Sequence, residues 1–354
     1  MPAILVEESA PFQANVDLDR QPVVSIITAT YNRSSVLRFA VESVRRQTLS
    51  SWEMWVVGDG CTDDTADVIR EIGDPRVRFV NLAQNCGDQS GPNNEAVLRA
   101  RGRFLAYLNH DDLWFPDHLE TAVRALNETG ADLVWPLIVK MDKHGVFTCG
   151  DLIIERRYAA HLSVPASFWV MRRELADEVG PWRHHQECHA TPSQDWLFRA
   201  GSLGKDLRYI PHFTAIALPS GGRPGAYANR EHLENQAVFE RIHADAQYRE
   251  KVLIAIAEQA SIVQANPPLW RGAVISAREF VRRRLAPFRG WPTEKSYTYP
   301  LAGAVRKRIR RWAGSWGVHP EAVELRLKYR RPGGFIQYLR RFRGLPPTPS
   351  GEGE

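Results

Sequence analysis

Short apolar runs alternate with helix-length amphipathic segments through the first third of this chain. The runs lie at 22–30, 52–57, 77–82 and 104–108, and three of them end in polar or acidic turns. Strands that alternate with helices of this length indicate parallel βαβ units. Because ligands of such sheets bind beyond the carboxyl ends of the strands, these turns should converge on one site. The pattern predicts an α/β fold with a mostly parallel central sheet flanked by helices.

Two adjacent carboxylates, Asp111 and Asp112, directly follow the apolar run at 104–108. Such a pair is unfavourable unless a cation neutralises it. Mg²⁺ and Mn²⁺ prefer oxygen ligands and often take one or two carboxylates together with substrate phosphates. The pair therefore predicts a metal-bridged diphosphate site. A solvated Asp-Asp turn at the start of the next helix is the alternative, because Pro116 follows four residues later.

Five short motifs resemble those of one enzyme family, the inverting nucleotide-sugar glycosyltransferases of family 2, which have the GT-A fold. The motifs are 24–33 (VSIITATYNR), 56–65 (VVGDGCTDDT), 85–87 (NCG), 108–112 (LNHDD) and 193–196 (SQDW). Each is weak alone, but they occur in the family's order and spacing across residues 22–220. The resemblance implies a GT-A domain over 22–266.

The resemblance also implies roles in binding the donor. Thr28 and Tyr31 would receive the nucleotide base, and Asp59 would contact the base or the ribose. Asn85 matches the family's third donor loop. A nucleoside diphosphate sugar is the expected donor, with a UDP-sugar favoured.

Metal binding and catalysis are implied for three further aspartates. Asp112 would be the direct ligand of Mg²⁺ or Mn²⁺, and Asp111 would contact the ribose or the waters of the metal. Asp195, near the start of a helix, would be the base that takes the proton of an acceptor hydroxyl. A capping role at the helix N-terminus is the structural alternative for Asp195.

The chain departs from the family pattern at four positions. Gly58, Asn109 and Gln194 replace acids, and Asn93 stands where the family often has an arginine. A phosphate contact would therefore be missing or supplied from another part of the chain.

Histidines offer two further candidates for metal binding. His212 follows a short apolar run and would complete the metal shell or contact diphosphate, unless it is a plain strand-end histidine. The segment 184–189 (HHQECH) suggests zinc, but neighbouring side chains do not easily converge and no second ligand pair stands at the spacing of a structural site.

Charge divides the chain into an acidic body and a basic extension. Residues 1–270 hold 27 basic and 35 acidic residues, whereas residues 271–345 hold 19 and 4. Arginines interleaved with aromatic residues predict that 271–345 binds an anionic membrane surface. Nucleic acid is the less favoured partner, and a solvated tail is the remaining alternative.

The predicted organisation follows from these features. Residues 1–21 form a flexible leader, 267–345 a helical basic, aromatic-rich extension, and 346–354 a disordered tail. One long helix is expected at 230–264, after a glycine-rich loop at 220–225 of the kind that closes over donor phosphates.

Several sequence features bear on the compartment. The four cysteines form no CxxC pair, and the N-terminus lacks the charge and hydropathy pattern of a signal peptide. No run of 18 uncharged apolar residues predicts a membrane span. We expect a cytoplasmic protein or one peripheral to the inner face of the cell membrane.

The function predicted is transfer of a sugar to a hydroxyl acceptor, either a saccharide or a lipid-linked molecule, in surface polysaccharide or glycolipid synthesis. A nucleotidyltransferase of similar fold is one alternative, although 31–34 contains no glycine. A noncatalytic protein that binds membranes or polyanions and whose nucleotide site has decayed is the other.

Overall fold

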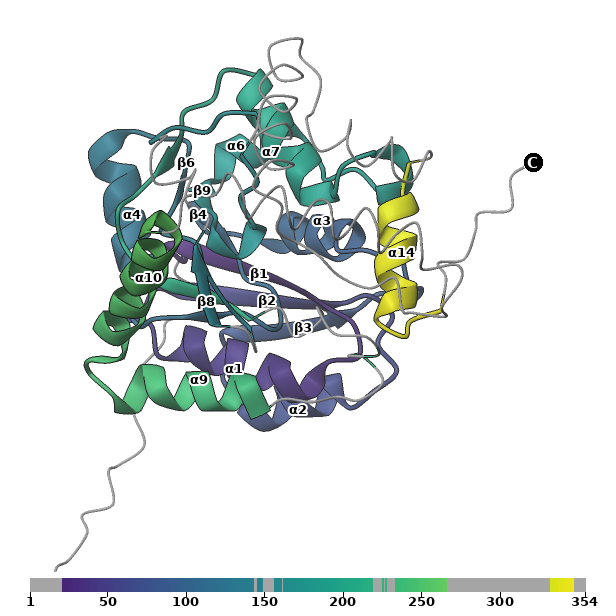
Figure 1. Ribbon diagram of the computed structural model, residues 1–354. Coiled ribbons are helices and arrows are strands. Elements are labelled where there is room, and N and C mark those ends of the chain that lie inside the picture. Colours follow the sequence, from purple (N-terminus) through teal and green to yellow (C-terminus); the bar gives the residue numbers. More distant parts are fainter. Residues whose placement is uncertain are drawn as a thin grey trace, which may run out of the picture.

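A large mixed sheet forms the centre of the molecule (Figure 1). The structure is a computed structural model, which describes residues 21–142, 145–148, 156–160, 162–218, 225, 227, 233–265 and 332–346. The strand order of this sheet is β10-β6-β9-β4-β1-β2-β3. Its strands are β1 (Val24–Thr30), β2 (Trp52–Gly58), β3 (Val77–Asn81), β4 (Phe104–Tyr107), β6 (Leu133–Trp135), β9 (Val170–Arg172) and β10 (Leu207–Tyr209).

Pairing in the large sheet is parallel except at β9. β1 pairs in parallel with both β2 and β4, with Val24 beside Trp52 on one side and Phe104 on the other. β9 is antiparallel to β4 and β6. The carboxyl ends of β1, β2 and β4 therefore meet at one edge, as the alternating sequence pattern predicts.

A second, smaller sheet has the order β5-β11-β7-β8. Its strands are β5 (Leu113–Trp114), β7 (Val139–Asp142), β8 (Gly145–Thr148) and β11 (Ala215–Ala217). This sheet packs in a second apolar cluster that includes Ile216 together with Val238 and Val252 of two later helices. It begins directly after Asp112, so the loop of the carboxylate pair joins the two sheets.

Helices cover both faces of the large sheet. Figure 1 shows α1, α2 and α9 below it and α3, α6 and α7 above it. The helices described are α1 (Ser34–Arg45), α2 (Thr65–Ile72), α3 (Ser90–Arg99), α4 (His118–Thr129), α6 (Arg173–Val179), α7 (Pro192–Ser202), α9 (Leu233–Ala244), α10 (Tyr248–Ala265) and α14 (Gly334–Phe342), with 3₁₀ turns η1 (Ala166–Phe168) and η2 (His185–Glu187).

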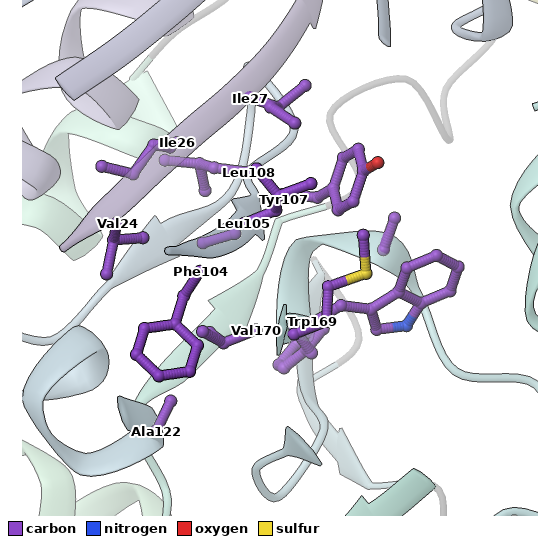
Figure 2. Packing of buried hydrophobic residues seen from close by; sticks show 14 of the residues in the cluster. Val24, Ile26, Ile27, Phe104, Leu105, Tyr107, Leu108, Ala122, Trp169 and Val170 are labelled. Atoms are coloured by element: carbon purple, nitrogen blue, oxygen red, sulfur yellow. The ribbon is translucent and has the colours of Figure 1, made fainter. Parts of the chain in front are cut away.

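The core packs helices against strands through completely buried side chains. Figure 2 shows Phe104 of β4 facing Ala122 of α4, and Tyr107 beside Trp169. The Tyr107 and Trp169 rings lie edge to face at 6.0 Å between centroids. Burying a large apolar side chain stabilises a fold by about 1.5–3 kcal/mol. Such packing fixes β4, and with it the loop that carries the carboxylate pair.

The elements predicted between residues 22 and 108 are observed, with ends that differ by one or two residues. The single helix predicted at 230–264 is wrong, because α9 and α10 are separate helices. Asp245 ends the first and begins the second: its carbonyl accepts a hydrogen bond from the Tyr248 N–H, and its carboxylate accepts one from Gln247. The leader, the glycine-rich loop except Gly225, most of the basic extension and residues 347–354 lie outside the described residues. No helix among those described is long and apolar enough to cross a membrane.

Candidate functional site

A cavity of about 300 Å³ opens at the carboxyl edge of the large sheet. Strand ends, the loop before α3, the turn after β4, the first turn of α7 and the C-terminal helix α14 together form its wall. The lining residues are Ala29, Thr30, Tyr31, Asp59, Gly87, Asp88, Gln89, Pro92, Asn109, His110, Asp111, Thr191, Pro192, Ser193, Tyr227, Ile336, Leu339, Arg340, Arg343 and Leu345. A cavity is therefore present at the sheet edge where the strand ends predicted a binding site.

The end of β1 contributes Thr30 and Tyr31 to this wall. The Thr30 hydroxyl is buried and has no hydrogen-bond partner among the described residues. Thr28, which the motif suggested for base binding, lies inside the sheet at 0% exposure and does not line the cavity. Thr30, two residues further along β1, does line the cavity, and the role of Thr28 in base binding stays a prediction.

Asp59 follows β2 and organises the neighbouring loop. Its carboxylate accepts hydrogen bonds from the backbone N–H groups of Cys86 at 2.6 Å and Gly87 at 3.0 Å. Burial nevertheless raises the pKa of Asp59. Asn85 donates to the Asp59 carbonyl at 2.7 Å and does not line the cavity. These two predicted binding residues thus shape the cavity, and only Asp59 reaches its wall.

A glycine before Asp59 is explained by the packing of β2 against β3. A Cβ atom on Gly58 would lie 2.5 Å from the Asn81 side-chain oxygen. That oxygen accepts a hydrogen bond from the Cys61 N–H, and the Asn81 amide donates to the Cys61 carbonyl. Asn81 therefore occupies the space that an acid at position 58 would need.

The two adjacent carboxylates have different surroundings. Asp111 lines the cavity, whereas Asp112 does not. The Asp112 oxygens accept hydrogen bonds from the Leu218 N–H at 2.9 Å and the Asn109 amide at 3.0 Å. Burial, followed by the nearby Asp111 charge, raises the pKa of Asp112 to about 7. Asp111 is therefore the member of the pair that faces the cavity, and the expectation that Asp112 is the direct metal ligand stays a prediction.

The donor set at Asp111 fits a hard divalent cation. Asp111 places one carboxylate on the cavity wall beside Asn109 and His110, and Mg²⁺ commonly takes one or two carboxylates together with substrate phosphates and water. His212, the other predicted metal residue, is exposed between β10 and β11 and does not line the cavity. The expectation that it completes the metal shell stays a prediction, and its exposed position after β10 also fits the plain strand-end histidine.

His110 and Tyr227 form a part of the wall that the motif analysis missed. The His110 Nδ1 lies 3.2 Å from the Ala29 carbonyl, and its Nε2 lies 3.5 Å from the Tyr227 hydroxyl. Burial lowers the pKa of His110, so the ring is neutral near pH 7. The Arg33 guanidinium lies 5.1 Å from the centroid of the Tyr227 ring. The one available signal was the position of His110 inside the 108–112 motif.

Asp195 lies in the first turn of α7, as predicted, but the same turn reaches the cavity through Thr191, Pro192 and Ser193. The Asp195 carboxylate is 3.1 Å from Arg199 and 3.7 Å from Arg183. Its place beside the cavity is compatible with a base for an acceptor, and its role stays a prediction.

The zinc interpretation of 184–189 leads to a different group of side chains. Asp88, His184 and His185 have potential ligand atoms within 4.8 Å of one another. The His185 Nδ1 is hydrogen-bonded to Asp88 at 2.6 Å, and the His184 Nε2 to the Cys86 carbonyl at 2.9 Å. Although burial opposes it, the His185 and Ser90 hydrogen bonds hold the pKa of Asp88 below its ordinary value. The group is thus an internal hydrogen-bond network that joins the loop before α3 to η2.

The last described part of the basic extension, which contains α14, contributes residues to this cavity. Figure 1 shows α14 beside α3, near the ends of the strands of the large sheet. Arg340 and Arg343 line the cavity, and neither was singled out by the sequence motifs. The prediction that 271–345 binds a membrane is untested for 271–331, which lie outside the described residues. Within 332–346, Arg340 and Arg343 line this cavity and Arg341 does not.

Comparison with solved structures identifies the fold. The structure of Staphylococcus aureus TarS 1–349 in complex with UDP is similar over 87% of this chain and 91% of that chain, with a TM-score of 0.50 and 16% identity. Mannosyltransferase PcManGT from Pyrobaculum calidifontis in complex with GDP-Man and Mn²⁺ is similar over 84% and 90%, with a TM-score of 0.50 and 19% identity. The fold is therefore that of the GT-A glycosyltransferases.

Comparison of the sequence then indicates the family. Residues 25–180 match the family described as Glycosyl transferase family 2, and this match supports a family 2 glycosyltransferase. The Escherichia coli UDP-Glc:alpha-D-GlcNAc-diphosphoundecaprenol beta-1,3-glucosyltransferase WfgD is 34% identical over 101 residues, which are 28% of this chain and 40% of WfgD. Succinoglycan biosynthesis protein ExoO of Rhizobium meliloti is 34% identical over 116 residues, 33% of each chain. The match thus spans well under half of these relatives.

Proposed function

We propose that this protein is an inverting glycosyltransferase that moves a sugar from a metal-bound nucleoside diphosphate donor to a hydroxyl acceptor. One observation carries the proposal: a family 2 domain has a cavity at its carboxyl strand edge that contains Asp111 and the unpartnered hydroxyl of Thr30. A nucleotidyltransferase is disfavoured by the family match. A decayed nucleotide site is disfavoured by the preserved cavity.

The donor is a nucleoside diphosphate sugar, with a UDP-sugar as the first candidate. Thr30 and Tyr31 lie where the base and ribose would enter, next to Asp59. Support for uracil comes from the names of WfgD and of the TarS complex, whereas PcManGT was solved with GDP-Man. The acceptor is a saccharide or a lipid-linked sugar, in line with the names of WfgD and ExoO.

Asp111 would hold Mg²⁺ or Mn²⁺ together with the donor phosphates. When bound, the cation supplies positive charge to the departing nucleoside diphosphate. The protein contributes the rigid turn that aims Asp111: the Asn109 N–H donates to Ser167 Oγ at 2.8 Å, and the Asn235 amide donates to the Asp111 carbonyl at 2.7 Å. Both bonds fix the backbone on either side of His110.

Asp195 is the base that we propose for the acceptor hydroxyl. It stands one turn along the helix start whose residues Thr191 and Ser193 line the cavity. Arg199 donates to its carboxylate and also to the carbonyls of Val179 and Pro181, which fixes the orientation of the pair. A carboxylate held in this way can accept a proton on the acceptor side without taking part in donor binding.

The test is calorimetry of the full chain with UDP and GDP, with and without Mn²⁺, followed by sugar-release assays with the matching sugar nucleotides. We expect metal-dependent binding of at least one diphosphate and release of that diphosphate from its sugar donor. A protein that binds neither diphosphate in the presence of Mn²⁺ would disprove the proposal.

A further inference from the structure

α14 is attached to the catalytic domain at both of its ends. Before the helix, the Gly333 N–H donates to the Cys188 carbonyl at 3.1 Å. At its end, the Phe342 carbonyl accepts from the Gly225 N–H at 2.9 Å and the Arg343 carbonyl from the Tyr227 N–H at 3.2 Å. A Cβ on Gly333, which has a φ of +70°, would lie 2.7 Å from the His185 ring. The helix is therefore held in one position against the cavity.

Arg340 is the cation that this position buries. Its side chain is 6% exposed, and it donates to the Gly87 carbonyl at 3.1 Å and to the Pro346 carbonyl at 2.9 Å. No carboxylate among the described residues forms an ion pair with it. Asp59 and Asp88 act on this guanidinium electrostatically without an ion pair, and its printed hydrogen bonds go to carbonyl oxygens, so it can still bind an anion in the cavity.

Arg343 lines the same cavity one turn later. Its guanidinium lies 5.8 Å from the centroid of the Tyr227 ring, and the Arg33 guanidinium lies 5.1 Å from the same centroid. Positions i and i+3 on a helix share a face, so Arg340 and Arg343 present two cations to one volume. Asn93, at the position where a phosphate-binding arginine was expected, is buried and does not line the cavity.

We propose that Arg340 and Arg343 bind the diphosphate of the donor, so that the phosphate contact absent at Asn93 comes from the C-terminal helix. The proposal rests on the proposed function. Arginine suits this task because its planar fork matches phosphate oxygens. The two guanidinium groups would also stabilise the negative charge that grows on the diphosphate as the sugar leaves.

The experiment compares the affinity of the full chain for UDP, UMP and uridine, and for the guanine series, in the presence of Mn²⁺. The variants are Arg343→Ala, Arg340→Ala and Arg340→Lys. Arg341→Ala is the matched control, because Arg341 is exposed on the same helix and does not line the cavity. Circular dichroism and thermal unfolding confirm that each variant is folded.

We expect Arg343→Ala and Arg340→Ala to lower affinity for the diphosphate by about 10- to 100-fold, the size of a lost charged hydrogen bond. Affinity for the nucleoside should change little, Arg340→Lys should retain an intermediate diphosphate affinity, and Arg341→Ala should bind like the wild type. If Arg340→Ala unfolds, Arg343→Ala and Arg340→Lys decide the question.

Two results would overturn the inference while leaving the proposed function intact. One is a wild-type diphosphate affinity in the folded arginine variants. The other is an equal loss for diphosphate and nucleoside, which would show that α14 only shapes the cavity. A wild-type protein that binds no diphosphate would instead remove the proposed function and this inference with it.

Discussion

The two walls of the cavity differ in charge and in their origin along the chain. The strand-end wall carries Asp59, Asp88 and Asp111, whereas the α14 wall carries Arg340 and Arg343. The first is assembled from loops that parallel strands bring together, and the second from a helix more than two hundred residues later. The difference teaches that one cavity can have two charge preferences: the acidic strand-end wall would attract a cation, and the basic α14 wall would attract an anion.

The largest effect should come from a residue outside both walls. Asp195→Asn keeps the shape of the side chain and removes its basicity, so sugar transfer should fall by about 10²- to 10⁴-fold. Donor affinity should stay near the wild-type value, because Asp195 touches neither wall. Steady-state kinetics and calorimetry measure the two quantities. A near-normal rate of sugar transfer, or a loss of donor affinity instead, would show that another residue is the catalytic base. The exposed Glu187 would be tested next.

The carboxylate pair gives the second prediction. Asp111→Asn should lower Mn²⁺-dependent affinity for the diphosphate by at least about 10- to 100-fold, to the level of the wild type with EDTA. Asp112→Asn should bind within a few-fold of the wild type, because the Asp112 oxygens already accept internal hydrogen bonds. Calorimetry with UDP or GDP distinguishes the two. The reverse ranking would favour Asp112 as the metal ligand.

The two walls can also be separated by removing the metal. In EDTA, Asp111→Asn and the wild type should bind the diphosphate equally weakly, whereas Arg343→Ala should still lower affinity, because its charge acts directly on phosphate. The measurement is the diphosphate affinity of the wild type, Asp111→Asn and Arg343→Ala, each with Mn²⁺ and with EDTA. An arginine effect that vanishes together with the metal would mean that the walls are not independent.

The smallest effect concerns stability alone. Burial lowers the pKa of His118 to about 3, and its ring stacks on Trp114 at 4.3 Å. The neutral imidazole is therefore the folded form. Because the unfolded chain takes up a proton first, the free energy of unfolding should fall as the pH drops from 6.5 towards 3. The slope from this one group is at most about 1.4 kcal/mol per pH unit.

His118→Phe should flatten this dependence without changing donor affinity near pH 7. Thr214→Val is the control, since it removes the hydroxyl that contacts His118 Nδ1 at 2.9 Å and leaves the titrating ring. Denaturant unfolding at several pH values measures the slope. An unchanged slope in His118→Phe would show that other groups govern the acid sensitivity.

The sheet could be predicted from the sequence because strand and helix periods alternate locally between residues 22 and 108. The correct neighbourhood of Asp59 and Asp111 followed from that alternation alone. Which of two adjacent aspartates faces the cavity could not be read, because it depends on the Leu218 N–H, more than a hundred residues later. Thr28 and Thr30 lie on the same face of β1, and only the length of the strand decides which of them reaches its end.

The α14 wall could not be predicted from the sequence, for a related reason. A run of arginines and aromatic residues is equally consistent with a membrane surface and with the enzyme's own cavity. The Gly87 carbonyl and the Tyr227 N–H position α14. Both are backbone groups far from α14 in the sequence, so the residue pattern of 332–346 does not indicate these contacts. The break between α9 and α10 was missed although Asp245 could have signalled it as a cap.

The hydrogen bond between Arg340 and the Gly87 carbonyl joins residues 253 positions apart. During synthesis, the sheet and its acidic loops can therefore fold long before the partner of Gly87 has been made. A nascent or truncated chain that stops before residue 332 would have a packed core and a cavity with only its acidic wall. The proposed ability to hold a diphosphate would then be acquired after the sheet has folded, once α14 has been made.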